Sequence, residues 1–112
     1  MIWETEEREG GAKVVVHLDG VVDSTNVEDF FALINSLLKR PVCRIVLDME
    51  NTSYLSSGGL SVIVDAYKKA EKAGGSLVIA RASETIADLF EVVQIGKIIP
   101  FYPTVEDALR GV

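Results

Sequence analysis

Two adjacent serines followed by two glycines form the stretch of this sequence that is best suited to chemistry. Ser56 and Ser57 precede Gly58 and Gly59, and Leu60 then opens a run with the apolar spacing of a helix. The first turn of a helix has backbone N–H groups without partners and carries the positive end of the helix dipole. A hydroxyl at this position is therefore well placed to hold a phosphate, either as a bound anion or as a covalent modification.

Groups that could support catalysis are few. His17 is the single histidine and lies in an apolar run typical of a strand, far in sequence from the serines. Cys43 is the single cysteine and opens another such run, where an inert buried thiol is the usual case. No Cys or His pair has the spacing of a metal site, and the glycine pair lacks the pattern of a nucleotide-binding loop. The sequence therefore predicts a protein that is not an enzyme and has no metal or cofactor.

Two carboxylates are also candidates for a site. Asp23 and Asp48 each follow an apolar run, and they could converge where the predicted strands end. Such a pair could bind a cation, but roles in a turn or a helix cap explain each aspartate equally well.

Length and composition predict one globular domain that covers residues 1–112. Hydrophobic residues make up 48% of the chain and charged residues 25%, which is ordinary for such a domain. The formal net charge of -6 argues against nucleic acids and anionic membranes as partners. No apolar run is long enough to cross a membrane, and the N-terminus lacks the features of a signal peptide. We therefore expect a cytoplasmic protein that does not insert into membranes.

Hydrophobic periodicity predicts strands that alternate with helices along the chain. We expect strands at residues 13–18, 43–49, 76–80 and 98–99, and an acidic arm at residues 4–9 that a turn at residues 10–11 joins to the first strand. We expect helices that start near residues 25, 60, 83 and 103, and a polar turn at residues 50–53. This alternation predicts an α/β fold with a single mixed, mostly parallel sheet of four to five strands and about four helices.

The first predicted helix has a clear start signal. Thr25 and Glu28 have the spacing of a capping box, in which a hydroxyl and a carboxylate bind the backbone N–H groups of the first turn. Pro41 ends the helix, and Thr104 has a similar signal before the last helix. The apolar residues predicted to share the buried face of the first helix are Val27, Phe30, Phe31, Ile34, Leu37 and Leu38.

Over nearly its whole length, the chain resembles the STAS family, and within it the bacterial anti-sigma factor antagonists. Residues 14–23 resemble the first segment of that family, an apolar strand ending in Gly-x-x-Asp, and residues 44–50 resemble its central strand. Residues 54–60 resemble its signature, an aromatic and an aliphatic residue followed by Asp-Ser-Ser/Thr-Gly-Leu or Ser-Ser-Ala-Gly-Leu. Ser56 occupies the position that the first of these forms gives to Asp.

This resemblance implies a switch operated by phosphorylation. In such antagonists, an anti-sigma factor that is itself a serine kinase phosphorylates a serine of the signature. Only the unphosphorylated antagonist binds that anti-sigma factor and releases the sigma factor, and a phosphatase resets the cycle. By position, the implied acceptor is Ser57, with Ser56 as the alternative. The implied partner-binding residues are Asp23, Ser56, Ser57, Gly58, Gly59 and Leu60.

Two other classes of function are compatible with the sequence. The chain could be a STAS-type module that binds a nucleotide or a lipid and regulates a separate transporter or sensor complex. It could also be a small enzyme that uses Ser57 as a nucleophile, which would require a base such as His17 or a carboxylate near that hydroxyl.

Overall fold

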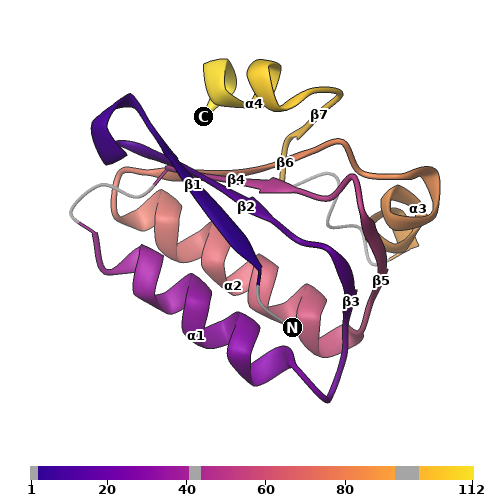
Figure 1. Cartoon of the computed structure of the whole chain (residues 1–112). Coiled ribbons are helices and arrows are strands. Elements are labelled where there is room, and N and C mark those ends of the chain that lie inside the picture. Colours follow the sequence, from indigo (N-terminus) through magenta and orange to yellow (C-terminus); the bar gives the residue numbers. More distant parts are fainter. Residues whose placement is uncertain (1–2, 41–43, 93–98) are drawn as a thin grey trace.

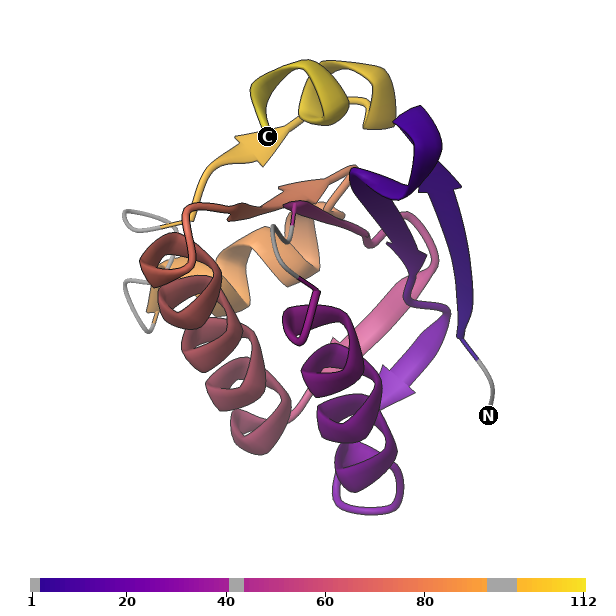
Figure 2. The same cartoon turned by 90° about the vertical axis from the view of Figure 1, so that its left-hand side faces the viewer.

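Helices lie on both faces of a central sheet. The structure, a computed structural model, describes residues 3–40, 44–92 and 99–112. Figure 1 shows two long helices on one face of the sheet and a short helix at the C-terminus on the other. Figure 2 gives the same arrangement in a view turned by 90°.

The main sheet has five strands in the order β1-β2-β4-β6-β7. These strands are β1 (Glu4–Arg8), β2 (Lys13–His17), β4 (Arg44–Asp48), β6 (Ser76–Ala80) and β7 (Phe101–Tyr102). Neighbouring strands are parallel except β1 and β2, which the short 3-10 turn η1 (Glu9–Gly11) joins as an antiparallel hairpin. The predicted mixed, mostly parallel sheet with a turn at residues 10–11 is therefore confirmed.

Helices α1 (Val27–Leu38) and α2 (Ser57–Lys72) lie side by side beneath the sheet (Figures 1 and 2). Helix α3 (Glu84–Val92) lies on the same side, and α4 (Val105–Gly111) covers the opposite face. Ser83 and Thr104 accept backbone hydrogen bonds at the starts of α3 and α4, as the sequence predicts. The four α-helices of the described residues agree with the expected number.

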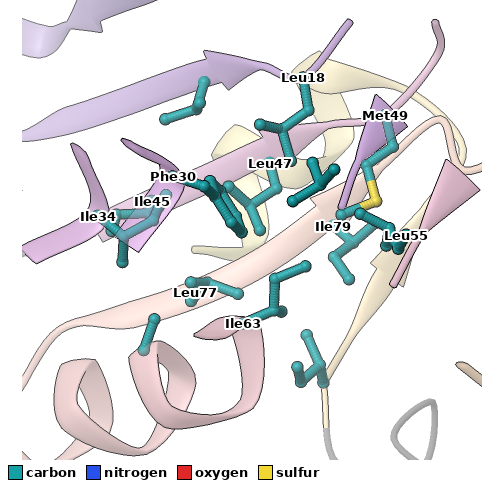
Figure 3. Packing of buried hydrophobic residues seen from close by; sticks show 14 of the residues in the cluster. Leu18, Phe30, Ile34, Ile45, Leu47, Met49, Leu55, Ile63, Leu77 and Ile79 are labelled. Atoms are coloured by element: carbon teal, nitrogen blue, oxygen red, sulfur yellow. The ribbon is translucent and has the colours of Figure 1, made fainter. Parts of the chain in front are cut away.

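The main core fills the space between the sheet and helices α1, α2 and α3. Alternate residues of the parallel strands point toward these helices, because successive side chains of a strand point to opposite faces. Figure 3 shows the packing, with Phe30 and Ile34 from α1 and Ile63 from α2 against the strand residues Ile45, Leu47, Leu77 and Ile79. A smaller cluster lies between the opposite face of the sheet and α4; it includes Val15, Val46 and Val78 from the strands and Ala108 and Leu109 from α4. Both faces of the central strands are thus buried, as their apolar sequences predict.

A second, two-stranded sheet was not predicted. Strands β3 (Gly20–Val22) and β5 (Thr52–Leu55) pair in parallel, the first continuing from β2 and the second from β4. We call this pair the ribbon. It leaves one end of the main sheet and runs toward the N-termini of α1 and α2 (Figure 1). The polar turn predicted at residues 50–53 is therefore wrong for Thr52 and Ser53, which belong to β5.

The capping box predicted for α1 is also wrong. The helix begins at Val27, and the side chain of its N-cap residue, Asn26, does not bond to the first turn. Thr25 Oγ1 donates to Asp23 Oδ1 over 2.6 Å instead. The Asn26 side chain accepts from the Asp23 amide over 2.9 Å and donates to the Val21 carbonyl over 2.8 Å. Asn26 therefore fixes the chain that enters the helix.

Two further predictions differ from the structure. Phe31 is 45% exposed, because the buried stripe of α1 is formed by Phe30, Ile34 and Leu37. Ile99, the described half of the strand predicted at residues 98–99, lies outside any strand, and the next strand, β7, begins at Phe101. Position 98 and Cys43 lie outside the described residues.

Candidate functional site

The ribbon brings the end of β3 beside the start of α2. The amide of Ser56 donates to the carbonyl of Val22 over 2.8 Å, which joins the residue after β5 to the last residue of β3. Asp23 directly follows Val22. The predicted site residues at positions 23 and 56–60 therefore meet at the tip of the ribbon, although more than thirty positions of sequence separate them.

Ser56 is the N-cap residue of α2. Its backbone is extended, with φ of -73° and ψ of 168°, and its Oγ accepts a hydrogen bond from the Gly59 amide over 3.2 Å. Its carbonyl accepts from the Leu60 amide over 3.0 Å. One of the first N–H groups of the helix is thus satisfied by this hydroxyl, so Ser56 has a structural role as the residue that caps α2.

Ser57 is the first residue of α2 and is exposed. Within the described part of the chain, its hydroxyl forms no hydrogen bond, unlike that of Ser56. The positive end of the helix dipole lies here. The structure therefore separates the two serines: one closes the helix start, and the other presents its hydroxyl to solvent.

The two glycines after these serines lie in different surroundings. A Cβ added to Gly58, which is exposed, would lie 3.6 Å from Cγ2 of Val27, an ordinary contact. A Cβ added to the buried Gly59 would lie 3.0 Å from Cγ1 of Val22, which is a close approach. Gly59 therefore lets α2 pack closely against β3, whereas Gly58 has room for a side chain.

Asp23 is half-buried and bonds within its own turn. Its Oδ1 accepts from the Thr25 amide over 2.9 Å and from the Thr25 hydroxyl, and its carbonyl accepts from the amides of Asn26 and Val27. The hydrogen bonds from the Thr25 hydroxyl and amide hold the pKa of Asp23 below its usual value. A negative charge is therefore fixed in the turn that directly follows β3.

Leu60 has a different place from the other predicted partner-binding residues. It is 7% exposed and belongs to the main core. Its side chain anchors the first turn of α2 from below, while Ser57 and Gly58 lie on the surface. Asn26 is the residue of this tip that the sequence analysis missed. Its position before an apolar run is typical of a residue that precedes a helix, but the capping-box spacing favoured Thr25 for that position.

A cluster of charged residues lies at the other end of the ribbon, where the main strands finish. Asp48, at the end of β4, is 4% exposed. Its two oxygens accept from Arg81 Nε and Nη2 over 3.0 and 2.6 Å, and Oδ2 lies 2.7 Å from Nδ1 of His17. Nη1 of Arg81 lies 2.6 Å from a carboxylate oxygen of Glu50. We call Asp48, Arg81, His17 and Glu50 the strand-end cluster.

This geometry does not favour the predicted alternatives that used Asp48 or His17. Asp23 bonds to Thr25, and Asp48 bonds to Arg81 and His17, so the two aspartates do not form one cation site. His17 lies with Val15 on the face of the sheet that α4 covers, whereas Ser57 starts a helix on the opposite face. Among the described residues, no group of three or more His, Cys, Asp or Glu is placed to hold a metal ion.

A hollow of about 400 Å³ lies above the strand-end cluster, between the β1–β2 hairpin and the start of α4. Two arginines line it, and both are paired. Arg81 bonds to Asp48 and Glu50, and Arg8 lies against Glu6 and 3.5 Å from Glu106. An anion entering this hollow would have to displace a carboxylate, so the hollow is a poor anion site.

None of the helices in the described part of the chain combines the length and the apolar character that crossing a membrane requires.

Comparisons with known proteins extend these observations. The model of the STAS domain family matches residues 3–108. Over 87 residues, the chain is 30% identical to BtrV of Bordetella bronchiseptica, provisionally named an anti-sigma factor antagonist; the match covers 78% of this chain and 75% of that protein. Over 97 residues, it is 27% identical to the anti-sigma F factor antagonist of Paenibacillus polymyxa, with 86% and 83% covered.

Solved structures share the fold. The anti-sigma factor antagonist SpoIIAA in its unphosphorylated form superposes with a TM-score of 0.81 at 23% identity, covering 99% of this chain and 98% of that chain. The phosphorylated form of Bacillus SpoIIAA gives a TM-score of 0.75 at 22% identity and covers 97% of each chain. At this level of identity, the two structures establish the fold.

Proposed function

The chain belongs to the STAS domain family, and we propose that it is an anti-sigma factor antagonist whose Ser57 is the phosphate acceptor of a binding switch. The observation that carries this proposal is the exposed hydroxyl of Ser57 at the first position of α2, next to a serine that is committed to capping the helix. The names of the two relatives support the same role. The proposed partner is an anti-sigma factor of the serine-kinase type, in the cytoplasm, and a phosphatase would reset the switch.

The proposed binding surface is the tip of the ribbon. Asp23, Ser56, Ser57 and Gly58 contribute exposed or half-buried groups there, and Gly59 and Leu60 support them from the interior. The exposed face of α2 would extend this surface. Tyr54, two residues before Ser56, is 48% exposed and adds an aromatic ring to this surface. Aromatic side chains are frequent energetic centres of protein interfaces.

Phosphorylation would act through charge at this surface. A phosphate on Ser57 adds about two negative charges at neutral pH. The first turn of α2 tolerates them because of the helix dipole, so the fold is preserved. Asp23 is already ionised nearby, since its pKa is lowered by Thr25. A partner that approaches the tip would therefore meet a concentrated negative charge, and binding would be lost through repulsion and desolvation.

The test is incubation with the kinase-type anti-sigma factor of the same organism and ATP, followed by mass spectrometry of the tryptic peptides. We expect one added phosphate on Ser57, absent in Ser57→Ala. Ser61→Ala is the matched control, because Ser61 is exposed on the same helix one turn further along. Ser56→Ala should still accept phosphate on Ser57. Modification confined to Ser56, or none with such a kinase, would show the assignment to be wrong.

A second measurement tests the binding step. Titration calorimetry with the same anti-sigma factor should give a complex with the unmodified protein and a much weaker one with the phosphorylated protein. Equal affinity of the two forms would contradict the proposed switch even if Ser57 were modified.

A further inference from the structure

The side chain of Asp48 joins three strands of the main sheet. It is buried at the end of β4, and it bonds to His17 at the end of β2 and to Arg81, the residue after β6. Its Oδ1 also accepts from the Glu50 amide over 3.2 Å. Such a buried carboxylate requires several partners to offset its loss of water. The cluster thus connects the strand ends from which both halves of the ribbon depart.

Backbone bonds continue this connection into the ribbon. The Asp48 carbonyl accepts from the Leu18 amide over 3.0 Å, and the Asn51 carbonyl accepts from the Gly20 amide over 2.9 Å. The hydroxyl of Thr52, which is 4% exposed, donates to the Leu18 carbonyl. These bonds lie at the base of the ribbon, and the bond from the Ser56 amide to Val22 lies at its tip.

The backbone of Arg81 provides an independent observation. Its φ is 56°, in the left-handed region that residues with a Cβ disfavour and glycine adopts readily. A turn that needed only this conformation would be better served by glycine. The guanidinium, which makes two bonds to Asp48 and one to Glu50, is what glycine would lack.

We propose that Asp48 and Arg81 are positioning residues for the switch: by fixing the base of the ribbon, they hold Ser56 and Ser57 beside β3 at its tip. The ribbon has only three or four residues in each strand. Base and tip are therefore roughly 10–13 Å apart along the strands. Over so short a distance, loss of the bonds at the base should also loosen the backbone at the tip. The consequence for phosphorylation rests on the proposed function, whereas the effect on the ribbon does not.

Hydrogen exchange of the isolated protein tests the proposal without any partner. The reporters are the amides of Gly20 and Ser56, which close the base and the tip, and the amide of Val46 in the central strand serves as the internal reference. We expect Arg81→Gly to speed exchange at both reporters by at least about tenfold relative to Val46. Asp48→Asn should act in the same direction. Unchanged protection at Ser56 in Arg81→Gly would overturn the proposal.

Two control variants separate positioning from a general loss of stability. Arg110→Ala removes another ion-paired arginine, on the opposite side of the sheet from Ser57, and should leave both reporters unchanged. Val78→Ala weakens the cluster under α4 and should speed exchange of the reporters and of Val46 together. If the control Val78→Ala raised the ratio of Ser56 to Val46 exchange as much as Arg81→Gly, the strand-end cluster would have no special role.

Phosphorylation of the same variants distinguishes this inference from the proposed function. With the kinase-type anti-sigma factor, Arg81→Gly should lower kcat/KM for phosphorylation of Ser57 by about tenfold, whereas Arg110→Ala should not change it. An altered ribbon with undiminished phosphorylation of Ser57 would refute the positioning role. Absence of phosphate in the unmutated protein would refute the proposed function and leave the exchange result as the test of the ribbon.

Discussion

Asp23 and Asp48 illustrate how the same residue type is controlled by its surroundings. Burial raises the pKa of Asp48, but hydrogen bonds from Arg81, His17 and the Glu50 amide outweigh it, and the pKa lies below its ordinary value. The pKa of Asp23, which lies at the molecular surface, is lowered by hydrogen bonds from Thr25. Both remain charged at neutral pH, one to tie strands together and one to charge the proposed binding surface.

The lowered pKa of Asp48 predicts acid sensitivity. A carboxylate whose pKa is lower in the folded than in the unfolded protein stabilises the fold above about pH 4, and this contribution is lost as the pH falls through the folded pKa. Urea unfolding between about pH 6 and 3 should therefore show a smaller loss of stability with acid in Asp48→Asn than in the unmutated protein. Asp65→Asn, which removes an exposed carboxylate of α2, is the control and should leave this slope unchanged. Parallel slopes for Asp48→Asn and the unmutated protein would contradict the assignment.

At the scale of elements, the first turn of α2 is positioned by its contact with β3. A side chain at Gly58 meets only an ordinary contact, so Gly58→Ala should raise the free energy of unfolding by up to about 1 kcal/mol through helix propensity. Gly59→Ala has the same propensity gain, but its Cβ would lie 3.0 Å from Cγ1 of the buried Val22, which would have to shift to make room. Urea denaturation should therefore give a higher free energy of unfolding for Gly58→Ala than for Gly59→Ala. Equal stability of the two variants would disprove the role given to Gly59.

The sequence predicted the long elements and missed the short ones for a physical reason. Strands such as Ser76–Ala80 and the helix Ser57–Lys72 carry apolar patterns over several residues, and the main sheet follows from them. β3 and β5 have too few residues for a visible period, and they are held by contacts between distant segments. The serine pair was found from its place before a helix. The strand-end cluster was not predicted, because the residues that flank Arg81 in the sequence do not indicate that it bonds to Asp48.

At the scale of the whole molecule, the proposed switch changes the surface and leaves the fold intact. Ser57→Asp adds one negative charge to a formal net charge of -6, at a helix start that favours it. We expect its free energy of unfolding to stay within about 0.5 kcal/mol of the unmutated value. Its affinity for the anti-sigma factor should fall at least about tenfold, measured by calorimetry. Ser61→Asp carries the same charge one turn away and should bind the anti-sigma factor more tightly than Ser57→Asp does. Undiminished affinity of Ser57→Asp would contradict the charge argument.

The parallel pairing of β3 and β5 also bears on the order of folding. Helix α1 and strand β4 separate the two strands in the chain, so closing the ribbon joins segments more than thirty positions apart, a non-local contact that is slow to form because loop closure costs entropy. Ser56 reaches Val22 only after that step. We therefore expect the helix start that displays Ser57 to be among the last parts of the molecule to assemble. A nascent or damaged chain would then lack the proposed binding surface, and only fully folded copies would take part in the proposed switch.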